Sequence, residues 1–170
     1  MKIYRSVLAA GAMLVLSGAA VEAQADYAMA APRKAEAPVT RADKLKQEAE
    51  SMFSTPKQWK KAQRLLVESA EMRDATDAEA YTCYMLAGRL AAVLGDNDDA
   101  RESLRKAAEH ALARGAIVDA ATAFIDAAHA AARVGDADEV ESLMQRAELL
   151  ANSPLISEQD RTAIEHRLRA

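Results

Sequence analysis

Three histidines and one cysteine are the side chains of this sequence best suited to metal binding or nucleophilic catalysis. His110, His129 and His166 lie far apart and form no H-x-x-x-H arrangement, so the spacing of a zinc site is missing. Cys83 stands in the most apolar stretch without a basic neighbour, which indicates a core thiol. No phosphate-binding glycine loop and no G-x-S-x-G motif occurs. We therefore predict a protein that is not an enzyme, with no catalytic, cofactor-binding or metal-binding residues.

A stripe of polar residues runs along an otherwise apolar segment, residues 116–134. Its members recur at the spacing of one helix face: Asp119, Thr122, Asp126, His129 and Arg133. Forty residues earlier, Thr82 and Arg89 stand at the places of Thr122 and His129. Such a stripe is either a binding face or the polar surface that any exposed helix shows to water, and both interpretations stay open.

A run of basic residues, Lys57, Lys60, Lys61 and Arg64, lies on one side of a predicted helix. The apolar residues Trp59 and Leu66 lie on the other side. The run could dock an acidic partner or lipid head groups, but its position opposite the apolar face favours a solvated surface.

The composition favours closely packed helices. Apolar residues make up 51% of the 170 residues and aromatic residues 4%, with alanine, the best helix former, prominent among them. The length fits one domain with a real core. A formal net charge of −4 argues against a nucleic-acid partner, which would require a strongly basic surface.

The first 25 residues have the pattern of a secretory signal peptide. Lys2 and Arg5 precede an uncharged run, residues 7–20, and the small-residue pattern Ala23-Gln24-Ala25 follows. The apolar run is too short to span a bilayer, so we expect no membrane span after cleavage. Residues 26–39, with two prolines and no apolar face, predict a flexible linker. We expect an exported protein, periplasmic or secreted, with a helical domain over residues 40–170.

Helix start and stop signals divide that domain. Predicted N-terminal caps have an acidic or amide residue three positions later: Thr40–Asp43, Thr55–Gln58, Thr76–Glu79, Asp96–Asp99, Asp136–Glu139 and Ser157–Asp160. Gly95, Gly115 and Gly135 fit helix C-termini. Together they predict helices over residues 41–53, 56–73, 77–94, 97–113, 116–134, 137–151 and 157–169, and an all-α fold. The third and fifth helices are apolar nearly all round and should be the most buried.

The pattern of the third and fourth helices returns about forty residues later. Corresponding pairs are Thr82 and Thr122, Tyr84 and Phe124, Gly88 and Ala128, Gly95 and Gly135, and Leu104 and Met144. Small residues recur where two helices must approach closely, and large ones where a gap must be filled. This recurrence predicts two consecutive helical hairpins of one kind.

On these residues the chain resembles the tetratricopeptide repeat, a helix-turn-helix unit. The small residue of that unit's first helix falls on Gly88 and Ala128, and its turn on Gly95-Asp96 and Gly135-Asp136. A more divergent unit covers roughly residues 41–73, and the last helix fits a cap. The usual period of 34 residues, the mid-helix aromatic and the terminal proline are not matched. The resemblance implies an α-α superhelix of about three hairpins plus a C-terminal capping helix.

The resemblance also implies a function. In such stacks the first helices of the hairpins line a concave groove that binds peptides or extended protein segments. The groove residues would be Lys44, Gln47, Ser51, Thr82, Arg89, Thr122, Asp126, His129 and Arg133. We therefore expect a protein-binding adaptor without a cofactor. The alternatives are a small-ligand-binding or enzymatic α-solenoid, and a structural envelope subunit that self-associates as a homo-oligomer.

Overall fold

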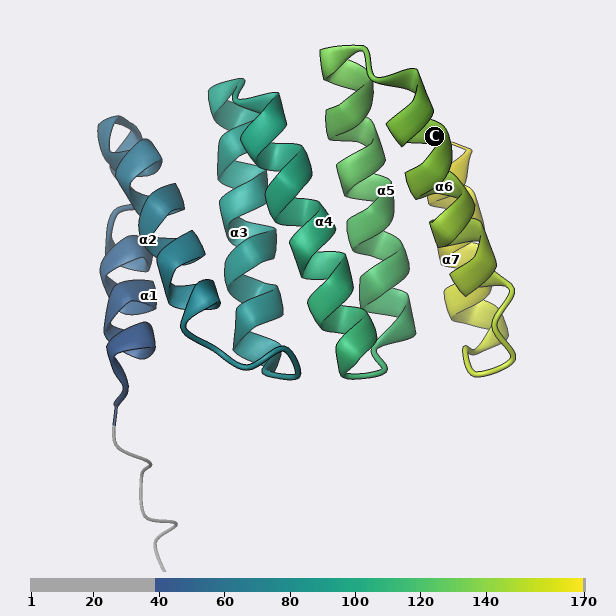
Figure 1. The fold of residues 1–170 in the computed structure, drawn as a ribbon, viewed down its shortest axis with the longest axis horizontal. Coiled ribbons are helices and arrows are strands. Elements are labelled where there is room, and N and C mark those ends of the chain that lie inside the picture. Colours follow the sequence, from purple (N-terminus) through teal and green to yellow (C-terminus); the bar gives the residue numbers. More distant parts are fainter. Residues whose placement is uncertain (1–38, 170) are drawn as a thin grey trace, which may run out of the picture. The chain divides into compact units, whose positions relative to one another are not determined.

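The computed structural model describes residues 39–169, and every regular element in this range is helical. The α-helices are α1 (Arg41–Ser51), α2 (Trp59–Glu71), α3 (Ala78–Leu94), α4 (Asn97–Ala113), α5 (Ile117–Val134), α6 (Ala137–Ala151) and α7 (Glu158–Leu168) (Figure 1). A 3₁₀ turn, Pro56–Gln58, leads into α2. The predicted all-α fold is confirmed for this range, and every predicted helix is found there.

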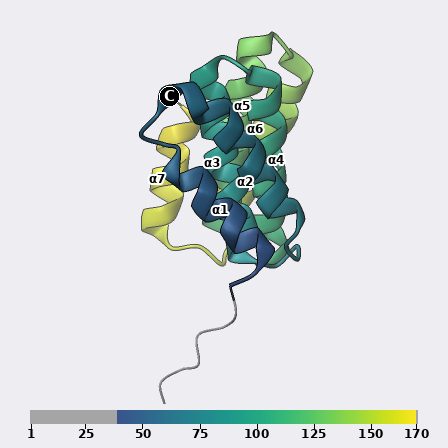
Figure 2. The same ribbon diagram turned by 90° about the vertical axis from the view of Figure 1, so that its left-hand side faces the viewer.

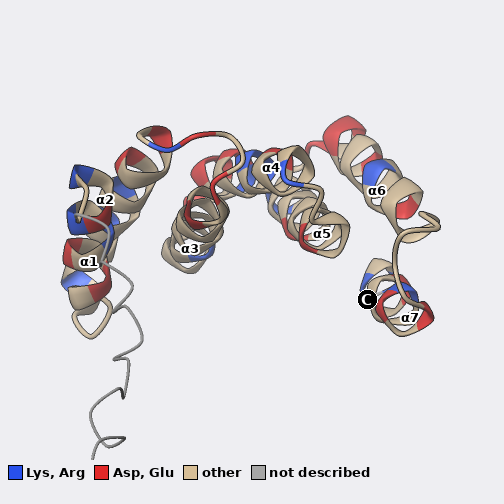
Figure 3. Ribbon diagram, turned by 90° about the horizontal axis from the view of Figure 1, so that it is seen from below, with Lys and Arg blue, Asp and Glu red and all other residues tan. Residues whose placement is uncertain are grey.

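The helices of residues 39–169 form two layers. Consecutive helices pack against each other from α1 to α7. Figure 3 shows α1, α3, α5 and α7 in one layer, here called the odd layer, and α2, α4 and α6 in the other, the even layer. Figure 2 looks along the row of helices, with the odd-layer helix α7 on one side and the even-layer helix α4 on the other. The odd-layer helices run in the same direction (Figure 1), so their carboxyl ends lie at the same end of the layer.

Three of the predicted helix caps form. Thr40 and Asp43 make a reciprocal capping box at the start of α1. Asp136 and Ser157 each accept a hydrogen bond from the backbone amide three residues later, at the starts of α6 and α7. These caps satisfy amide groups that the first helical turn leaves without a partner.

Three predicted caps are wrong. Thr55 makes no capping bond, because the chain enters a 3₁₀ turn at Pro56. Asp77, one residue after the predicted Thr76, caps α3. Asp96 makes no side-chain cap on α4, and its carboxylate instead accepts a hydrogen bond from Lys60 Nζ at 2.6 Å. Local sequence identifies candidate caps, but a local turn, a neighbouring residue or, at Asp96, a long-range partner can prevent a candidate from capping its helix.

Glycine acts in two different ways in the central helices. Gly95 and Gly135 end α3 and α5 with φ angles of +82° and +81°, a left-handed conformation that costs glycine little. Gly88 is needed for a close approach: a Cβ there would lie 2.6 Å from Leu104 Cγ and 3.2 Å from the Ala100 carbonyl oxygen. The expectation that Gly88 lets α3 approach α4 is therefore confirmed.

The core is built largely of alanine, with a few large side chains filling the wider gaps. Three of these, Tyr84, Phe124 and Ile164, are only 3%, 1% and 2% exposed and stand forty residues apart, on α3, α5 and α7. The helices α3 and α5 have the most buried residues of the described helices, as predicted. The forty-residue spacing seen in the sequence thus reappears as a spacing of buried side chains.

The predicted signal peptide, residues 1–25, lies outside the described residues, as does all of the predicted linker, residues 26–39, except Val39. Both stay predictions. Within residues 39–169, none of the helices combines the length and the apolar character that crossing a bilayer requires.

Candidate functional site

The residues predicted to form a binding face lie on α1, α3 and α5, all in the odd layer. The exposed ones are Lys44, Gln47, Ser51, Arg89, His129 and Arg133, and the partly buried ones are Thr82, Thr122 and Asp126. The spacing of the α5 members by three or four residues puts them along one side of that helix. The fold therefore carries all of them on one layer, with most of them open to solvent.

Asp126 differs from its neighbours because it is engaged within the protein. Its side chain is 19% exposed, and Arg167 of α7 donates a hydrogen bond to its Oδ1 at 2.5 Å. Arg89 of α3 lies 3.7 Å from its other oxygen. Asp126 thus links α3, α5 and α7, and in this structure it holds helices together rather than offering a free carboxylate to a partner.

The hydroxyl of Thr82 is also used internally. It donates a hydrogen bond to the Ala78 carbonyl oxygen of its own helix at 3.1 Å. Close by in sequence, Glu79 pairs with Lys46 of α1, which ties the first two helices of the odd layer together. The Thr82 hydroxyl is therefore engaged within α3, and the pair beside it links α3 to α1.

Two of the stripe's basic side chains, His129 and Arg133, form no ion pair with any residue of the range 39–169. Both are exposed and lie in the carboxyl-terminal half of α5. Arg89 is exposed in the carboxyl-terminal half of α3, and its single ion pair, to Asp126, is long. Because the odd-layer helices run in parallel, these groups lie toward the same end of the layer.

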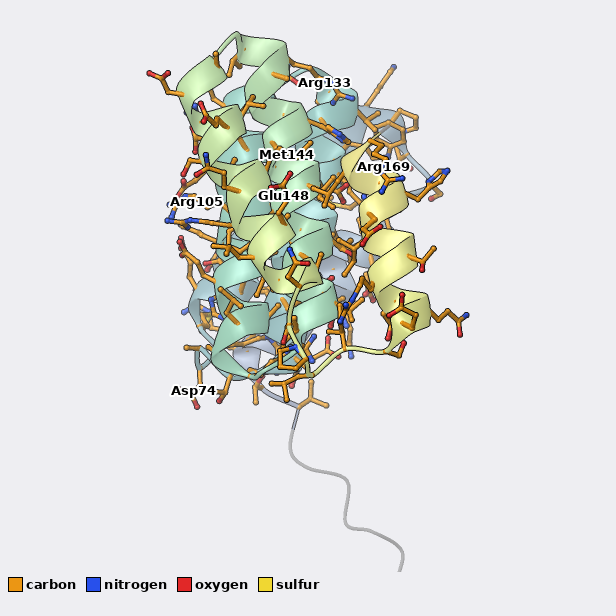
Figure 4. All side chains as sticks on the ribbon, turned by 90° about the vertical axis from the view of Figure 1, so that its right-hand side faces the viewer. Asp74, Arg105, Arg133, Met144, Glu148 and Arg169 are labelled. Atoms are coloured by element: carbon orange, nitrogen blue, oxygen red, sulfur yellow. The ribbon has the colours of Figure 1, made fainter. Side chains whose placement is uncertain are left out.

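Two residues that the sequence interpretation missed extend this stripe onto α7. Thr162 and Arg169 stand forty residues after Thr122 and His129, and both are exposed. Arg169, the residue that follows the end of α7, pairs with Glu165 of that helix at 3.2 Å. Figure 4 labels Arg133 and Arg169 toward the same end of α5 and α7. Continuing the forty-residue spacing past residue 151 would have found both.

In the even layer, ion pairs bridge neighbouring helices at two seams. At the first seam, between α2 and α4, Lys60 Nζ lies 2.6 Å from Asp96. At the second seam, between α4 and α6, Arg101 lies 3.0 Å from Asp136, forty residues after Asp96. Asp96 and Asp136 thus occupy corresponding turns, and each pairs with a basic side chain of the preceding helix in the even layer.

The basic run, which begins in the 3₁₀ turn and continues on α2, is largely solvent-exposed, as the sequence interpretation favoured, and two of its residues also pair with other helices. Lys60 bridges to α4 as described, and Lys61 pairs with Glu48 of α1 at 2.8 Å. Lys57 and Arg64 are exposed and make no ion pair among the described residues. The spacing along α2 gave no sign of these partners, because they belong to other helices.

Cys83 lies fully buried in α3, as predicted. Its thiol donates to Ser69 Oγ at 3.6 Å, and burial raises the pKa of the thiol. The raised pKa lowers the fraction of the reactive thiolate at neutral pH. Among residues 39–169, no three His, Cys, Asp or Glu side chains lie together in a way that could hold a metal ion.

Comparison of this chain with protein-family models, with curated proteins and with solved structures gives no significant match. The likeness to the tetratricopeptide repeat therefore rests on the residues quoted above.

Proposed function

We propose that this protein is an exported helical-repeat adaptor, a tetratricopeptide-like superhelix of about three hairpins closed by α7, that binds a protein segment along its odd layer. The observation that carries the proposal is a polar pair recurring on three successive odd-layer helices. The pairs are Thr82 with Arg89, Thr122 with His129, and Thr162 with Arg169, each forty residues from the next. Export rests on the pattern of residues 1–25.

The charge of this face suggests the chemistry of the partner. Cationic or hydrogen-bonding groups are presented from parallel helices by Arg89, His129, Arg133 and Arg169. The carboxylate of Asp126, in contrast, is mostly covered. An extended segment that carries carboxylates or exposed backbone carbonyls would pair with them. Such binding should weaken as salt is added, since the groups are solvent-exposed.

The test is capture of a partner from the native cell envelope by the wild-type protein and by a triple variant, Arg89→Ala, His129→Ala and Arg133→Ala. We expect the triple variant to lose the captured protein while its circular dichroism stays that of wild type, because all three side chains are exposed. Lys57→Ala with Arg64→Ala is the matched control. It also removes two formal positive charges, from exposed residues of the 3₁₀ turn and of α2 that make no ion pair among the described residues, and it should retain capture. Retention by the triple variant would overturn the assignment of this face.

A further inference from the structure

The last hairpin leaves an apolar hollow open at the α6 end of the row of helices. The hollow measures about 360 Å³ and is lined by Ala132, Gly135, Ala137, Val140 and Glu141. Glu141 supplies the one charged side chain of this lining. A helical stack usually ends in a unit with a polar outer face, so an apolar hollow at its end indicates a surface that another molecule covers.

Comparison with the preceding hairpin shows what the α6 end lacks. Ala100 and Leu104 of α4 are 0% and 3% exposed. Their equivalents forty residues later, Val140 and Met144 of α6, are both partly exposed. The difference is cover, because α5 packs closely along α4 whereas α7 makes a much smaller contact with α6. Figure 4 looks onto this end of the row, where Met144 is labelled.

The ion pairs at the two seams of the even layer share one polarity, which the α6 end reverses. Lys60 of α2 pairs with Asp99 of α4 at 3.0 Å. Arg101 of α4 pairs with Glu139 of α6 at 2.7 Å. At both seams the base stands on the helix nearer α1. Forty residues after Arg101 stands Glu141, an exposed acid, so the place that would face a further helix has changed sign.

The first even-layer helix, α2, carries the opposite reversal. Leu66 of α2 is fully buried, as Leu104 of α4 is 38 residues later. In this alignment Lys61 takes the place of Asp99, so a base stands where the seam between α2 and α4 has an acid. Lys61 pairs with Glu48 of α1 at 2.8 Å, but both side chains are largely exposed, and such a pair contributes little.

Lys61 and Leu65 lie one turn apart on the side of α2 that is turned away from α4. Lys60 and Gln63, which reach Asp99 of α4, lie on the other side of the helix. Leu65 is partly exposed. The α1–α2 end of the row thus offers a base beside an apolar side chain, and the α6 end offers an acid beside an apolar hollow.

The net charges of the two ends are opposite as well. Residues 41–72 hold seven basic and five acidic side chains, whereas residues 136–169 hold four basic and eight acidic ones. Ends of opposite charge attract each other and orient the encounter of two copies.

We propose that copies of this protein associate head to tail, with the α1–α2 end of one copy on the α6 end of the next. Leu65 of one copy would enter the apolar hollow, and Lys61 would pair with Glu141 at its rim. Glu141 accepts a hydrogen bond from Gln145 of its own helix at 3.0 Å, and its exposed carboxylate keeps room for a second donor. Because the two ends differ, each joined pair still exposes one of each, and association stays open-ended.

The first test is sedimentation velocity of the full chain over a wide range of protein concentrations. We expect dimers and then longer species as the concentration rises. The dissociation constant should increase at least about tenfold between ~50 mM and ~500 mM salt, since the pairing groups are exposed. Sedimentation as a monomer throughout, or as a closed dimer that grows no further, would overturn the proposal.

Charge reversal identifies the contact. Glu141→Lys and Lys61→Glu should each weaken association at least about tenfold, and a chain that carries both changes should recover it. Recovery cannot arise within one copy, because the two residues lie at opposite ends of the row. Glu109→Lys reverses an exposed acid of α4, inside the row, and is the matched control that should associate like wild type. Equal weakening by this control, or no recovery in the double variant, would contradict head-to-tail pairing.

Discussion

The helices α5 and α7 share one layer but are held in very different ways. Both bury a large side chain at corresponding positions, Phe124 and Ile164. Yet α5 is packed between α4 and α6 with nine buried residues, whereas Ile164 is the one fully buried residue of α7. The link between Arg167 and Asp126 supplies its main polar contact to α5. A single large buried residue can thus pack a helix against the stack. The number of buried alanines around that residue then determines how strongly the helix is held.

The strongest test of this comparison is truncation of the two corresponding side chains. Phe124→Ala should lower the free energy of unfolding by about 4 kcal/mol, because it leaves a large cavity between three helices. Ile164→Ala should cost about 3 kcal/mol or less, since α7 can detach instead of leaving a cavity. Urea unfolding followed by circular dichroism measures both. The contrast is supported if the unfolding curve of Ile164→Ala alone shows a second transition at low urea. It is contradicted if both variants unfold in a single transition with the same loss of free energy.

The next largest effect concerns the close approach of α3 and α4. Gly88→Ala should destabilise the protein by about 2 kcal/mol, because the new Cβ would meet Leu104 Cγ at 2.6 Å. The gain in helix propensity, about 1 kcal/mol, only partly offsets that clash. Thermal unfolding of Gly88→Ala, of Leu104→Ala and of the double variant tests the cause. If Leu104→Ala does not relieve the effect of Gly88→Ala, the clash is not its source.

A smaller effect is expected where α7 meets α5. Arg167→Ala should cost about 1 kcal/mol, as a partly exposed ion pair does. The loss should be local, with faster amide hydrogen exchange in α7 and little change in α3 or α5. Arg169→Ala, which removes an exposed pair within α7, is the control and should leave exchange in α7 nearly unchanged. Faster exchange throughout α3 and α5 would contradict a loosely held α7.

The smallest effect lies at the opposite end of the described chain, at the start of α1. Hydrogen bonds from the backbone and the hydroxyl of Thr40, followed by one from Arg73, lower the pKa of Asp43 from 3.8 to about 2. A lowered pKa in the folded state adds stability above pH 3.8 that is lost as the pH falls to about 2. Wild type should therefore lose more stability than Asp43→Asn between pH 4 and pH 2. Equal acid sensitivity in urea titrations would show that Asp43 does not contribute.

Much of the fold follows from local patterns. Gly95 and Gly135 end their helices as predicted, Thr40, Asp136 and Ser157 cap theirs, and the apolar character of the third and fifth helices predicts their burial. These features depend on residues within a few positions of one another, so their spacing in the chain carries the information. The predicted binding face is a harder case, because its residues could be named from the sequence while the contacts of each side chain could not.

The order of the helices, the burial of α3 and α5 and the forty-residue recurrence that aligns Tyr84 with Phe124 can all be read from the chain without coordinates. The partners of the charged groups cannot: Asp126 accepts a hydrogen bond from Arg167, 41 residues away, and Asp96 accepts one from Lys60, 36 residues away. The difference is one of range, because caps and helix periodicity act within one or two turns, whereas ion pairs depend on which helices pack side by side.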